Sequence, residues 1–227
     1  MIPALEPDRE LHRCIDSVHL ALAGTGRYEI LVVMPPRAVA AATAMFHDVR
    51  VEPERRRGIY AAMNDGAAAS QGRYLLFLGK DDILLPTIRE VAVLAGAGPA
   101  AVSCDVYWGD RGVYSGRPSR WRLLTRNICH QGVVYARAAF DRHGPYLRRM
   151  RVQADHLFNI RLLWDRSPMT GGIRYLPKPL VWYSGSGFSN TQRDPLFRRL
   201  YPGVIRRYVG RWAACALLLS RALRARP

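Results

Sequence analysis

The sequence predicts an α/β fold, in which helices flank a mostly parallel central sheet. Two short apolar runs, Tyr28–Met34 (YEILVVM) and Arg73–Leu78 (RYLLFL), have the composition of strands that are buried on both faces. Segments of about 10–15 residues with helical spacing lie between the predicted strands, which is typical of βαβ units. The chain has 227 residues, of which 49% are apolar, so its length and composition fit one large globular domain.

The first half of the chain alternates predicted strands and helices. Leu11, Ile15 and Val18 share one face of the first helix. Pro35 ends the first apolar strand, and Gly72 follows the end of the third helix. In chain order we expect a helix over Glu10–Leu22, a strand over Tyr28–Met34, a helix over Ala38–His47, a strand over His47–Val51, a helix over Tyr60–Ser70, a strand over Arg73–Leu78 and a helix over Ile88–Leu94.

The second half is richer in loops and ends in a basic segment. We expect strands over Ala101–Trp108 and Gly132–Tyr135 and a helix over Asp155–Leu163. From Leu196 to Val209, pairs of apolar residues recur every four residues with arginines between them, which predicts an amphipathic helix. We therefore divide the chain into one domain over residues 1–190 and a basic helical segment over residues 191–227.

The chain is strongly basic, and almost all of its positive charge comes from arginine. It has 34 lysines and arginines against 18 acidic residues, a formal charge of +16, and only Lys80 and Lys178 are lysines. A GC-rich genome explains part of this bias, but residues 193–227 alone hold nine arginines and one aspartate, a balance of +8. Such a charge is compatible with a nucleic-acid-binding protein, a membrane-surface protein or an enzyme for anionic substrates.

The cysteines and the apolar runs indicate a protein of the reducing cytosol. Cys14, Cys104, Cys129 and Cys215 are far apart in the sequence, which excludes a zinc site of the CxxC type and favours free thiols. The first ten residues lack the apolar core of a signal peptide, and no apolar run reaches the roughly 18 residues that span a bilayer. We therefore expect no leader and no membrane span.

Two adjacent carboxylates, Asp81 and Asp82, follow the predicted strand Arg73–Leu78. Ligands of open parallel sheets bind at the carboxyl ends of the strands, and carboxylate oxygens are ligands that Mg²⁺ and Mn²⁺ prefer. Such a metal usually completes its coordination shell with phosphate oxygens of the substrate. The alternative is structural, because Asp82 could instead cap the N-terminus of a following helix.

The stretch from Arg57 to Pro86 resembles the donor-binding half of glycosyltransferase family 2. The matching positions, in order and without gaps, are Gly58–Tyr60, Ala62–Asn64, Gly66, Gly72, Tyr74, Phe77–Leu78 and Asp81–Asp82. This resemblance implies a GT-A fold with Mg²⁺ or Mn²⁺ held by Asp82 and assisted by Asp81. It also implies a nucleoside-diphosphate sugar as donor, with donor-binding positions at Arg57, Gly58, Tyr60, Met63, Asn64 and Lys80. For Lys80, a solvated side chain is the alternative to a phosphate contact.

Three later segments are also similar to this family: Asn127–Gln131 (NICHQ), Val152–His156 (VQADH) and Tyr183–Asn190 (YSGSGFSN). The second segment implies that Asp155 is the catalytic base of an inverting enzyme, although Asp155 taken alone would also suit a helix cap. The resemblance places the donor half at about residues 1–100 and the acceptor half at about residues 101–190. Acceptor-pocket residues are then His130, Gln131, His156, Arg120 and Arg122, and for the first three a buried structural role is the alternative.

The chain departs from the family pattern at several places. Compared with the pattern, either most of the first strand is absent at Met1–Ala4 or the start site lies further upstream. Met34 stands where the family usually has an aspartate that contacts the nucleotide base. Arg56 and Ala61 replace two further aspartates of the pattern. The metal and base motifs are therefore retained, but the identity of the donor does not follow from the resemblance.

We therefore expect an inverting glycosyltransferase that acts on a lipid-linked or polysaccharide acceptor in cell-surface glycan biosynthesis. The protein would be cytoplasmic, either free or peripheral at the inner face of the cytoplasmic membrane. The basic C-terminal segment either packs its apolar face on the domain or lies on an anionic membrane, and no motif supports nucleic acid as a partner. One alternative function is a catalytically weakened binding or scaffold protein, motivated by the departures from the family pattern. Another is a nucleic-acid-binding protein, which rests on charge alone.

Overall fold

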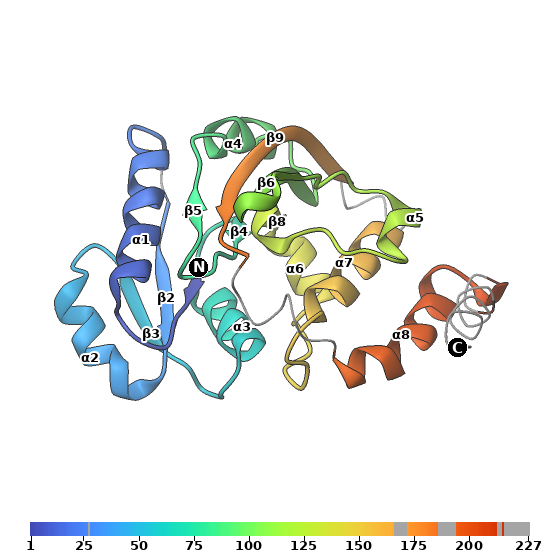
Figure 1. The fold of residues 1–227 in the computed structure, drawn as a ribbon, viewed down its shortest axis with the longest axis horizontal. Helices are drawn as coiled ribbons and strands as arrows, with labels where there is room; N and C mark the ends of the chain where they lie inside the picture. Colours follow the sequence, from blue (N-terminus) through green and yellow to red (C-terminus); the bar gives the residue numbers. More distant parts are fainter. Residues whose placement is uncertain (27, 166–171, 186–193, 213–214, 216–227) are drawn as a thin grey trace.

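The computed structural model describes residues 1–26, 28–165, 172–185, 194–212 and 215, and its path is shown in Figure 1. The strands in this part of the chain are β1 (Ile2–Pro3), β2 (Leu31–Met34), β3 (Arg50–Pro53), β4 (Tyr74–Leu76), β5 (Ile83–Leu84), β6 (Ala101–Trp108), β7 (Val113–Tyr114), β8 (Val133–Ala136) and β9 (Ile173–Tyr183). The α-helices are α1 (Arg9–Leu22), α2 (Pro36–Met45), α3 (Ile59–Ala69), α4 (Ile88–Ala95), α5 (Arg120–Leu123), α6 (Arg137–His143), α7 (Ala154–Trp164) and α8 (Pro195–Tyr208).

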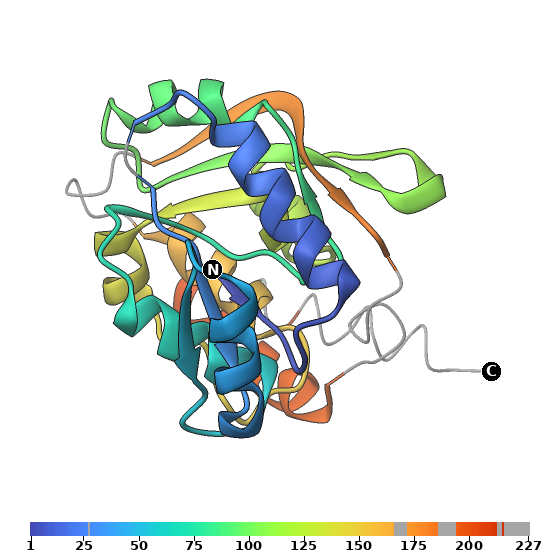
Figure 2. The same ribbon diagram turned by 90° about the vertical axis from the view of Figure 1, so that its left-hand side faces the viewer.

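The first sheet is parallel and has the order β1-β2-β3. All four residues of β2 are buried, as expected for a strand with both faces covered. Helix α3 packs against β1 and β2, and α2 packs against β3. Helices α1 and α2 lie in front of the strands in Figure 2. Helix α1 buries Leu11, Ile15 and Val18, the residues whose spacing predicts its apolar face.

The second sheet has the order β4-β8-β6-β9-β5, and β7 pairs with β6 at its side. Strands β6 and β9 are parallel, whereas the other pairs in this sheet are antiparallel. The predicted α/β class, with parallel strands and flanking helices, is confirmed, and the parallel pairing is concentrated in the first sheet. Sequence periodicity does not encode strand direction, because a strand that is buried on both faces shows the same apolar run in either orientation.

The segment from Met1 to Ala4 connects the two sheets. The Met1 nitrogen donates to Leu76 O at 2.9 Å, Leu78 N donates to Met1 O at 3.0 Å, and Ala4 N donates to Val33 O at 3.0 Å. One apolar cluster joins α1, α2 and α4 to the strands, and a second cluster joins α3, α6, α7 and α8 to them. The strands therefore form a central layer with helices on both sides.

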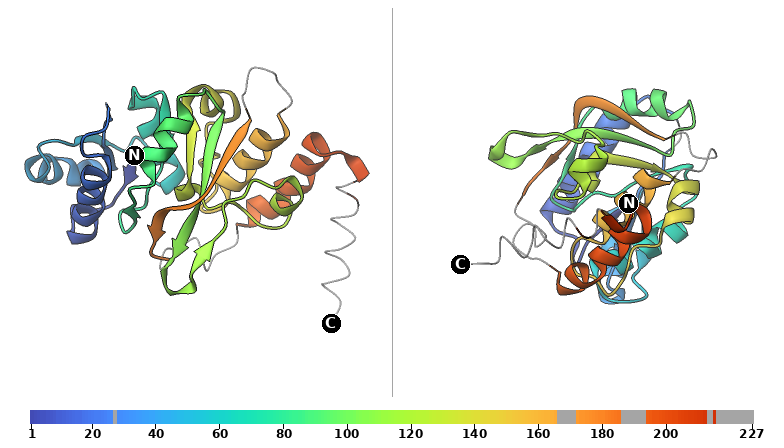
Figure 3. Two further views of the ribbon diagram at one scale, coloured as in Figure 1. Left: turned by 90° about the horizontal axis from the view of Figure 1, so that it is seen from above. Right: turned by 90° about the vertical axis from the view of Figure 1, so that its right-hand side faces the viewer.

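Helix α8 packs its apolar face against α7. Phe197, Tyr201 and Ile205 are buried in α8, so the apolar stripe of residues 195–208 packs on the rest of the protein. Figure 3 (left) shows α8 at the end of the molecule opposite α1 and α2. Residues 191–193, 213, 214 and 216–227 of the predicted basic segment lie outside the described residues. None of the described helices is long and apolar enough to cross a membrane.

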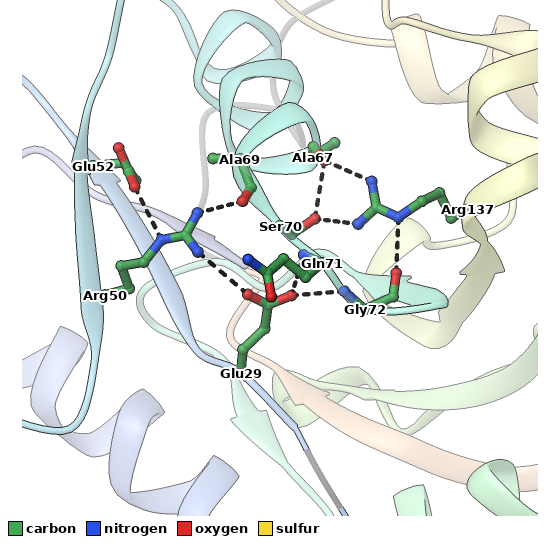
Figure 4. Close-up of polar contacts among 9 residues, drawn as sticks. All are labelled: Glu29, Arg50, Glu52, Ala67, Ala69, Ser70, Gln71, Gly72 and Arg137. Carbon is green, nitrogen blue, oxygen red and sulfur yellow. Dashed lines mark hydrogen bonds and ion pairs between the residues drawn. The ribbon is translucent and has the colours of Figure 1, made fainter.

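Arg137, at the start of α6, holds the C-terminal end of α3 (Figure 4). Its Nη1 donates to Ala67 O at 2.9 Å, its Nε donates to Gly72 O at 2.9 Å, and its Nη2 donates to Ser70 Oγ at 2.6 Å. The last carbonyl groups of a helix lack partners within the helix and carry partial negative charge. A planar guanidinium group satisfies them and connects α3 to β8 and α6.

Arg50 on β3 holds the same end of α3 from the other side (Figure 4). Its Nη2 donates to Ala69 O, and its Nη1 lies 3.7 Å from Glu29 Oε2. The Glu29 carboxylate accepts hydrogen bonds from Gln71 N at 2.5 Å and from Gly72 N at 2.7 Å. The two arginines therefore connect α3 to both sheets.

We expect the substitution Arg137→Met to lower the free energy of unfolding by about 2 kcal/mol, because it leaves two backbone carbonyl groups without a charged donor. Arg13→Met, which removes an exposed arginine of α1, is the matched control and should change the free energy by less than about 0.5 kcal/mol. Urea denaturation followed by circular dichroism measures both values. Equal stability of the two variants would contradict the structural role of Arg137.

Candidate active site

A cleft of about 200 Å³ lies at the carboxyl ends of the parallel strands β6 and β9, and we call it the Asp155 cleft. Its lining residues come from α3, the ends of β6, β7 and β9, the loop before β8 and the start of α7. They are Tyr60, Trp108, Tyr114, Asn127–Gln131, Val152, Gln153, Asp155 and Tyr183. The carboxyl ends of parallel strands are the usual ligand-binding edge of an α/β sheet.

Asp155 carries a buried charge in this cleft. It is 5% exposed, and its carboxylate accepts hydrogen bonds from Tyr60 Oη to Oδ1 at 2.5 Å and from Asn127 Nδ2 to Oδ2. His130 Nδ1 lies 3.5 Å from the same Oδ2 atom. Burial raises the pKa of Asp155, but hydrogen bonding and charge from His130, together with the Tyr60 hydrogen bond, outweigh burial and lower the pKa to about 2. The carboxylate is therefore ionised at neutral pH.

The turn that presents Asp155 has an uncommon backbone conformation. Gln153, the N-cap residue of α7, has a φ of 70°, in the left-handed region that residues other than glycine seldom adopt. Its Oε1 accepts a hydrogen bond from Asp194 N at 3.2 Å, and Asp194 Oδ2 accepts one from Arg151 N at 2.6 Å. Asp194 also caps the N-terminus of α8. The start of α8 therefore holds the turn that positions Asp155. Because Gln153 is the N-cap residue of α7, the helix-cap alternative for Asp155 is wrong.

Asp81 and Asp82 follow β4. Asp82 is fully buried, its Oδ2 accepts a hydrogen bond from Gly79 N at 2.6 Å, and its Oδ1 has no hydrogen-bond partner in the part of the chain that the structure describes. Burial raises the pKa of Asp82 to about 7, against the lowering effect of the Gly79 N–H group. Asp81 accepts a hydrogen bond from Ser184 Oγ, just after β9. A strand, β5, begins after Asp82, so the helix-cap alternative for Asp82 is wrong.

The two adjacent aspartates fit a divalent cation. Mg²⁺ is usually held by one or two carboxylates together with phosphate oxygens of a substrate. A buried carboxylate oxygen without a partner costs roughly 1–3 kcal/mol, which a bound cation would offset. Asp82 Oδ1 is such an oxygen. Within the described residues, no three or more His, Cys, Asp and Glu side chains gather in a metal-binding cluster.

A second cleft, of about 400 Å³, lies at the carboxyl ends of β2 and β3, and we call it the arginine cleft. Its lining residues are Pro35, Pro36, Arg37, Glu54, Arg55, Arg56 and Arg57. Helices α2 and α3 begin at this edge, and helix N-termini and arginine side chains both favour bound anions. Arg57 in this cleft and Tyr60 in the Asp155 cleft are three residues apart, so the first turn of α3 separates the two clefts.

The structure brings four of the predicted site residues together in the Asp155 cleft, namely Tyr60, His130, Gln131 and Asp155. Gln131 is buried, and its Oε1 accepts a hydrogen bond from Cys129 Sγ at 2.9 Å. Arg57 lies in the arginine cleft. Gly58 precedes α3 with a φ of 121°, a backbone conformation that a side chain would strain.

Nine predicted site residues line neither cleft: Gly58, Met63, Asn64, Lys80, Asp81, Asp82, Arg120, Arg122 and His156. The methionine is buried in the apolar cluster that includes α3. Asn64 exchanges two hydrogen bonds of 2.9 Å with the backbone of Tyr146. Lys80 forms ion pairs with Asp8 and Glu10, so its amine is held by α1 and the residue before it.

The predicted acceptor residues outside the clefts, His156, Arg120 and Arg122, contact other parts of the protein. His156 hydrogen-bonds Leu123 O at 2.6 Å, its ring stacks on an aromatic side chain of α8, and burial lowers its pKa. Arg120 donates to a backbone carbonyl of α7 at 3.3 Å. The guanidinium group of Arg122 lies 5.2 Å from the ring centroid of Tyr114, which itself lines the Asp155 cleft. Arg122 is therefore close to the cleft, whereas His156 packs against α8.

Sequence reasoning does not assign a site role to eight residues that line the Asp155 cleft: Trp108, Tyr114, Asn127, Ile128, Cys129, Val152, Gln153 and Tyr183. Asn127 and Gln153 belong to the segments NICHQ and VQADH, so their closeness to a motif is a usable signal. Trp108 is the last residue of a predicted strand, and strand ends are where ligands bind in α/β sheets. Residues 186–190 of the predicted glycine-rich loop lie outside the described residues.

Comparison with known sequences identifies glycosyltransferases as relatives of this chain. The model of the family "Glycosyl transferase family 2" matches residues 1–159 of the chain. A PGL/p-HBAD biosynthesis glycosyltransferase of Mycobacterium tuberculosis is 32% identical over 248 residues, which cover 98% of this chain and 92% of the relative. The relative from Mycobacterium bovis gives the same values.

Solved structures share the fold at low sequence identity. S. aureus TarS 1–349 in complex with UDP-GlcNAc has a TM-score of 0.73 and 14% identity, with 96% of this chain and 69% of the TarS chain covered. In another structure of TarS 1–349, with a TM-score of 0.64, this chain spans 62% of the TarS chain. Glucosyl-3-phosphoglycerate synthase from Mycobacterium tuberculosis, with Mn²⁺, UDP and phosphoglyceric acid, has a TM-score of 0.52 and 19% identity, covering 97% and 76% of the two chains. The family match and the 32% identity show that this chain belongs to glycosyl transferase family 2 and is a glycosyltransferase with the GT-A fold.

Proposed function

We propose that this glycosyltransferase is an inverting enzyme that moves a sugar from a nucleoside-diphosphate sugar to an acceptor hydroxyl. The observation that carries the proposal is a pair of buried carboxylates, Asp82 and Asp155, in contrasting environments. Burial raises the pKa of Asp82 to about 7, whereas hydrogen bonds and the charge of His130 lower the pKa of Asp155 to about 2. Carboxylates whose environments separate their pKa values in this way suit different chemical roles.

The arginine cleft is the proposed site of the donor nucleotide. Arg37, Arg55, Arg56 and Arg57 place positive charge where β2 and β3 end, next to the N-termini of two helices. A nucleoside diphosphate is an anion that matches this charge. The TarS and glucosyl-3-phosphoglycerate synthase structures contain UDP-GlcNAc and UDP, which supports a nucleotide-sugar donor for this chain as well.

Asp82, assisted by Asp81, is the proposed ligand of Mg²⁺ or Mn²⁺. Its Oδ1 is buried and has no hydrogen-bond partner among the residues that the structure describes, so a cation bound there would compensate its charge. When bound, the cation would neutralise charge on the departing diphosphate. Structures of glucosyl-3-phosphoglycerate synthase with Mg²⁺ or Mn²⁺ and UDP support a divalent cation for this chain.

Asp155 is the proposed general base. Its carboxylate accepts the proton of the acceptor hydroxyl while the hydroxyl oxygen attacks the anomeric carbon and the diphosphate leaves with the bonding electron pair. A single displacement from the side opposite the leaving group inverts the anomeric configuration. Because hydrogen bonds and the charge of His130 lower the pKa of Asp155 to about 2, the carboxylate is ionised at neutral pH and able to accept a proton. Tyr60 and Asn127 fix the orientation of the carboxylate.

We place the reaction in cell-surface glycan biosynthesis, on a lipid-linked or polysaccharide acceptor at the inner face of the cytoplasmic membrane. A basic surface on α8 and the residues just after it supports this setting. Its exposed arginines are Arg198, Arg199, Arg206, Arg207 and Arg211. Beside them Trp212 is 81% exposed. Helix α5, whose Trp121 is 74% exposed, lies near α8, because Leu124 O just after α5 accepts a hydrogen bond from Tyr201 Oη of α8.

This basic surface has the composition of a membrane-contacting face. Each arginine near an anionic bilayer contributes on the order of 1 kcal/mol, and tryptophan is enriched at the headgroup level of membranes. The apolar stripe of α8 is buried, so the contact we propose is electrostatic with tryptophan anchors and does not require insertion of the helix. Nucleic acid is the alternative polyanionic partner of this surface, and a binding experiment distinguishes it from an anionic membrane.

Asp82→Asn and Asp155→Asn separate the proposed metal and base roles. With Mn²⁺ present, we expect one of UDP, GDP and dTDP to bind the wild type and Asp155→Asn equally, and to bind Asp82→Asn at least about tenfold more weakly, as measured by calorimetry. Sugar transfer or donor hydrolysis should fall at least about 100-fold in both variants, provided that circular dichroism shows an intact fold. Full turnover in both variants would exclude these roles. Failure of all three nucleotides to bind the wild type would favour the scaffold alternative.

Tyr60→Phe should raise the pKa of Asp155 by about one unit, because it removes one hydrogen bond to the ionised carboxylate. The pKa of Asp155 lies below its ordinary value, so its contribution to stability is complete above about pH 4 and is lost as the pH falls through about 2. In Tyr60→Phe this loss should begin at a higher pH. Carbon-13 NMR titration of the aspartate carboxyl groups measures the shift, with Tyr107→Phe as the control outside the cleft. An unchanged pKa would mean that the hydrogen bond does not form in solution.

Vesicle binding tests the basic surface on α8. We expect co-sedimentation with vesicles of phosphatidylglycerol and phosphatidylcholine, none with phosphatidylcholine alone, and loss of binding at high salt. Replacing Arg199, Arg206 and Arg207 by glutamate should abolish binding, while replacing the exposed Arg9, Arg13 and Arg37 by glutamate is the matched control and should leave most of it. Tighter binding to DNA than to the anionic vesicles would contradict the membrane assignment.

A further inference from the structure

Three aromatic side chains line one part of the Asp155 cleft: Trp108, Tyr114 and Tyr183. The Trp108 ring packs edge-on against both tyrosines, with ring centroids 5.0 Å from Tyr114 and 5.4 Å from Tyr183. Trp108 and Tyr183 are the last residues of β6 and β9 and lie side by side in the register of these parallel strands. Tyr114 is the last residue of β7, which pairs with β6. The sheet itself therefore fixes the three rings, which we call the aromatic wall.

The aromatic wall is connected to the proposed base by hydrogen bonds. Tyr114 Oη donates to Asn127 O, and Asn127 Nδ2 donates to Asp155 Oδ2. Apolar ring faces and the ionised carboxylate thus line one cleft of about 200 Å³. This volume is below the roughly 300–1,000 Å³ of clefts that hold drug-sized ligands, so it suits a single ring better than an extended chain.

Two further features of the aromatic wall indicate a ligand that also carries polar groups. The Trp108 Nε1–H group is covered and has no hydrogen-bond partner among the described residues. Covered polar groups in folded proteins nearly always have a partner, and a ligand or a water is the usual one when the protein supplies none. Arg111 lies 5.6 Å from the Trp108 ring centroid, and Arg126 lies 4.6 Å from that of Tyr114, so the wall also carries positive charge.

We propose that the aromatic wall is the acceptor subsite and that Trp108 determines its preference for a pyranoside ring. A pyranose has an apolar face of C–H groups, which packs on aromatic rings, and a rim of hydroxyl and ether oxygens, which accept hydrogen bonds. With its face on Trp108 and Tyr183, the sugar offers a ring oxygen or hydroxyl to the indole N–H and a second hydroxyl to Asp155. The proposal rests on the proposed function, because it takes Asp155 as the base that meets the acceptor.

Binding of small pyranosides tests the proposal without knowledge of the natural acceptor. The probes are the methyl pyranosides of glucose, galactose, mannose and rhamnose, and the matched open-chain controls are the corresponding alditols. With UDP and Mn²⁺ present, saturation-transfer NMR should show binding of at least one methyl pyranoside and at least about tenfold weaker binding of its alditol. Trp108→Ala should weaken the pyranoside at least about tenfold. Trp108→Phe, which keeps a ring but removes the N–H, should weaken it about threefold.

Two controls separate the subsite from the remainder of the site. Trp121→Ala removes an exposed tryptophan outside the cleft and should bind the pyranosides like the wild type. Calorimetry with UDP and Mn²⁺ should give equal nucleotide affinity in Trp108→Ala and the wild type. A wild type that binds no nucleotide would refute the proposed function, whereas normal nucleotide binding with pyranoside affinity unaffected by Trp108→Ala would refute the aromatic wall alone. The proposal would also be overturned if none of the pyranosides bound. Phenol serves as an aromatic probe, and tighter Trp108-dependent binding of phenol than of the pyranosides would contradict the proposal as well.

Discussion

A single buried charge, the Asp155 carboxylate, sets the main constraint on this structure. A carboxylate that has lost its water must be compensated by hydrogen bonds or by opposite charge, because an uncompensated buried ion costs several kcal/mol. The compensation comes from Tyr60 on α3, 95 residues away in the sequence, and from Asn127 and His130 in the loop before β8. The charge can therefore be buried only when both halves of the chain are assembled. The reactive group and the long-range order of the fold depend on the same contacts.

Helix α3 extends this order to the donor side. Its first turn separates the arginine cleft from the Asp155 cleft, its middle is tied to Tyr146 through Asn64, and its end is held by Arg50 and Arg137. A helix held at three points is a rigid spacer. Rigid spacing matters for sugar transfer, because the acceptor oxygen and the anomeric carbon must approach to about 3–3.5 Å in the correct orientation. The hydrogen bonds of Asn64 therefore serve the site although its side chain lines neither cleft.

The sequence is sufficient to predict most of the helices and strands and the position of the two carboxylate motifs, because these depend on local patterns. The run RYLLFL before Asp81 and Asp82 is such a pattern, and so is the helical spacing after Asp155. The partners of Lys80 and Asn64 were not predictable, because they lie 72 and 82 residues away and result from the pairing of whole elements. The left-handed backbone of Gln153 has no local signal either, since it is maintained by contacts with Asp194 at the start of α8.

Arginines serve different physical roles at different positions of this chain, and the net charge does not distinguish between these roles. Arg137 uses its planar fork to reach three oxygens at the end of α3, and the compact ammonium group of a lysine does not reproduce that geometry. Arg55–Arg57 line a cleft, and Arg206 and Arg207 face water, where charge matters more than shape. Lysine would supply the same charge at such surface positions, but it would not reproduce the hydrogen bonds at the end of α3. Replacing Arg137 by lysine would keep the formal charge at +16 and still remove hydrogen bonds to the end of α3.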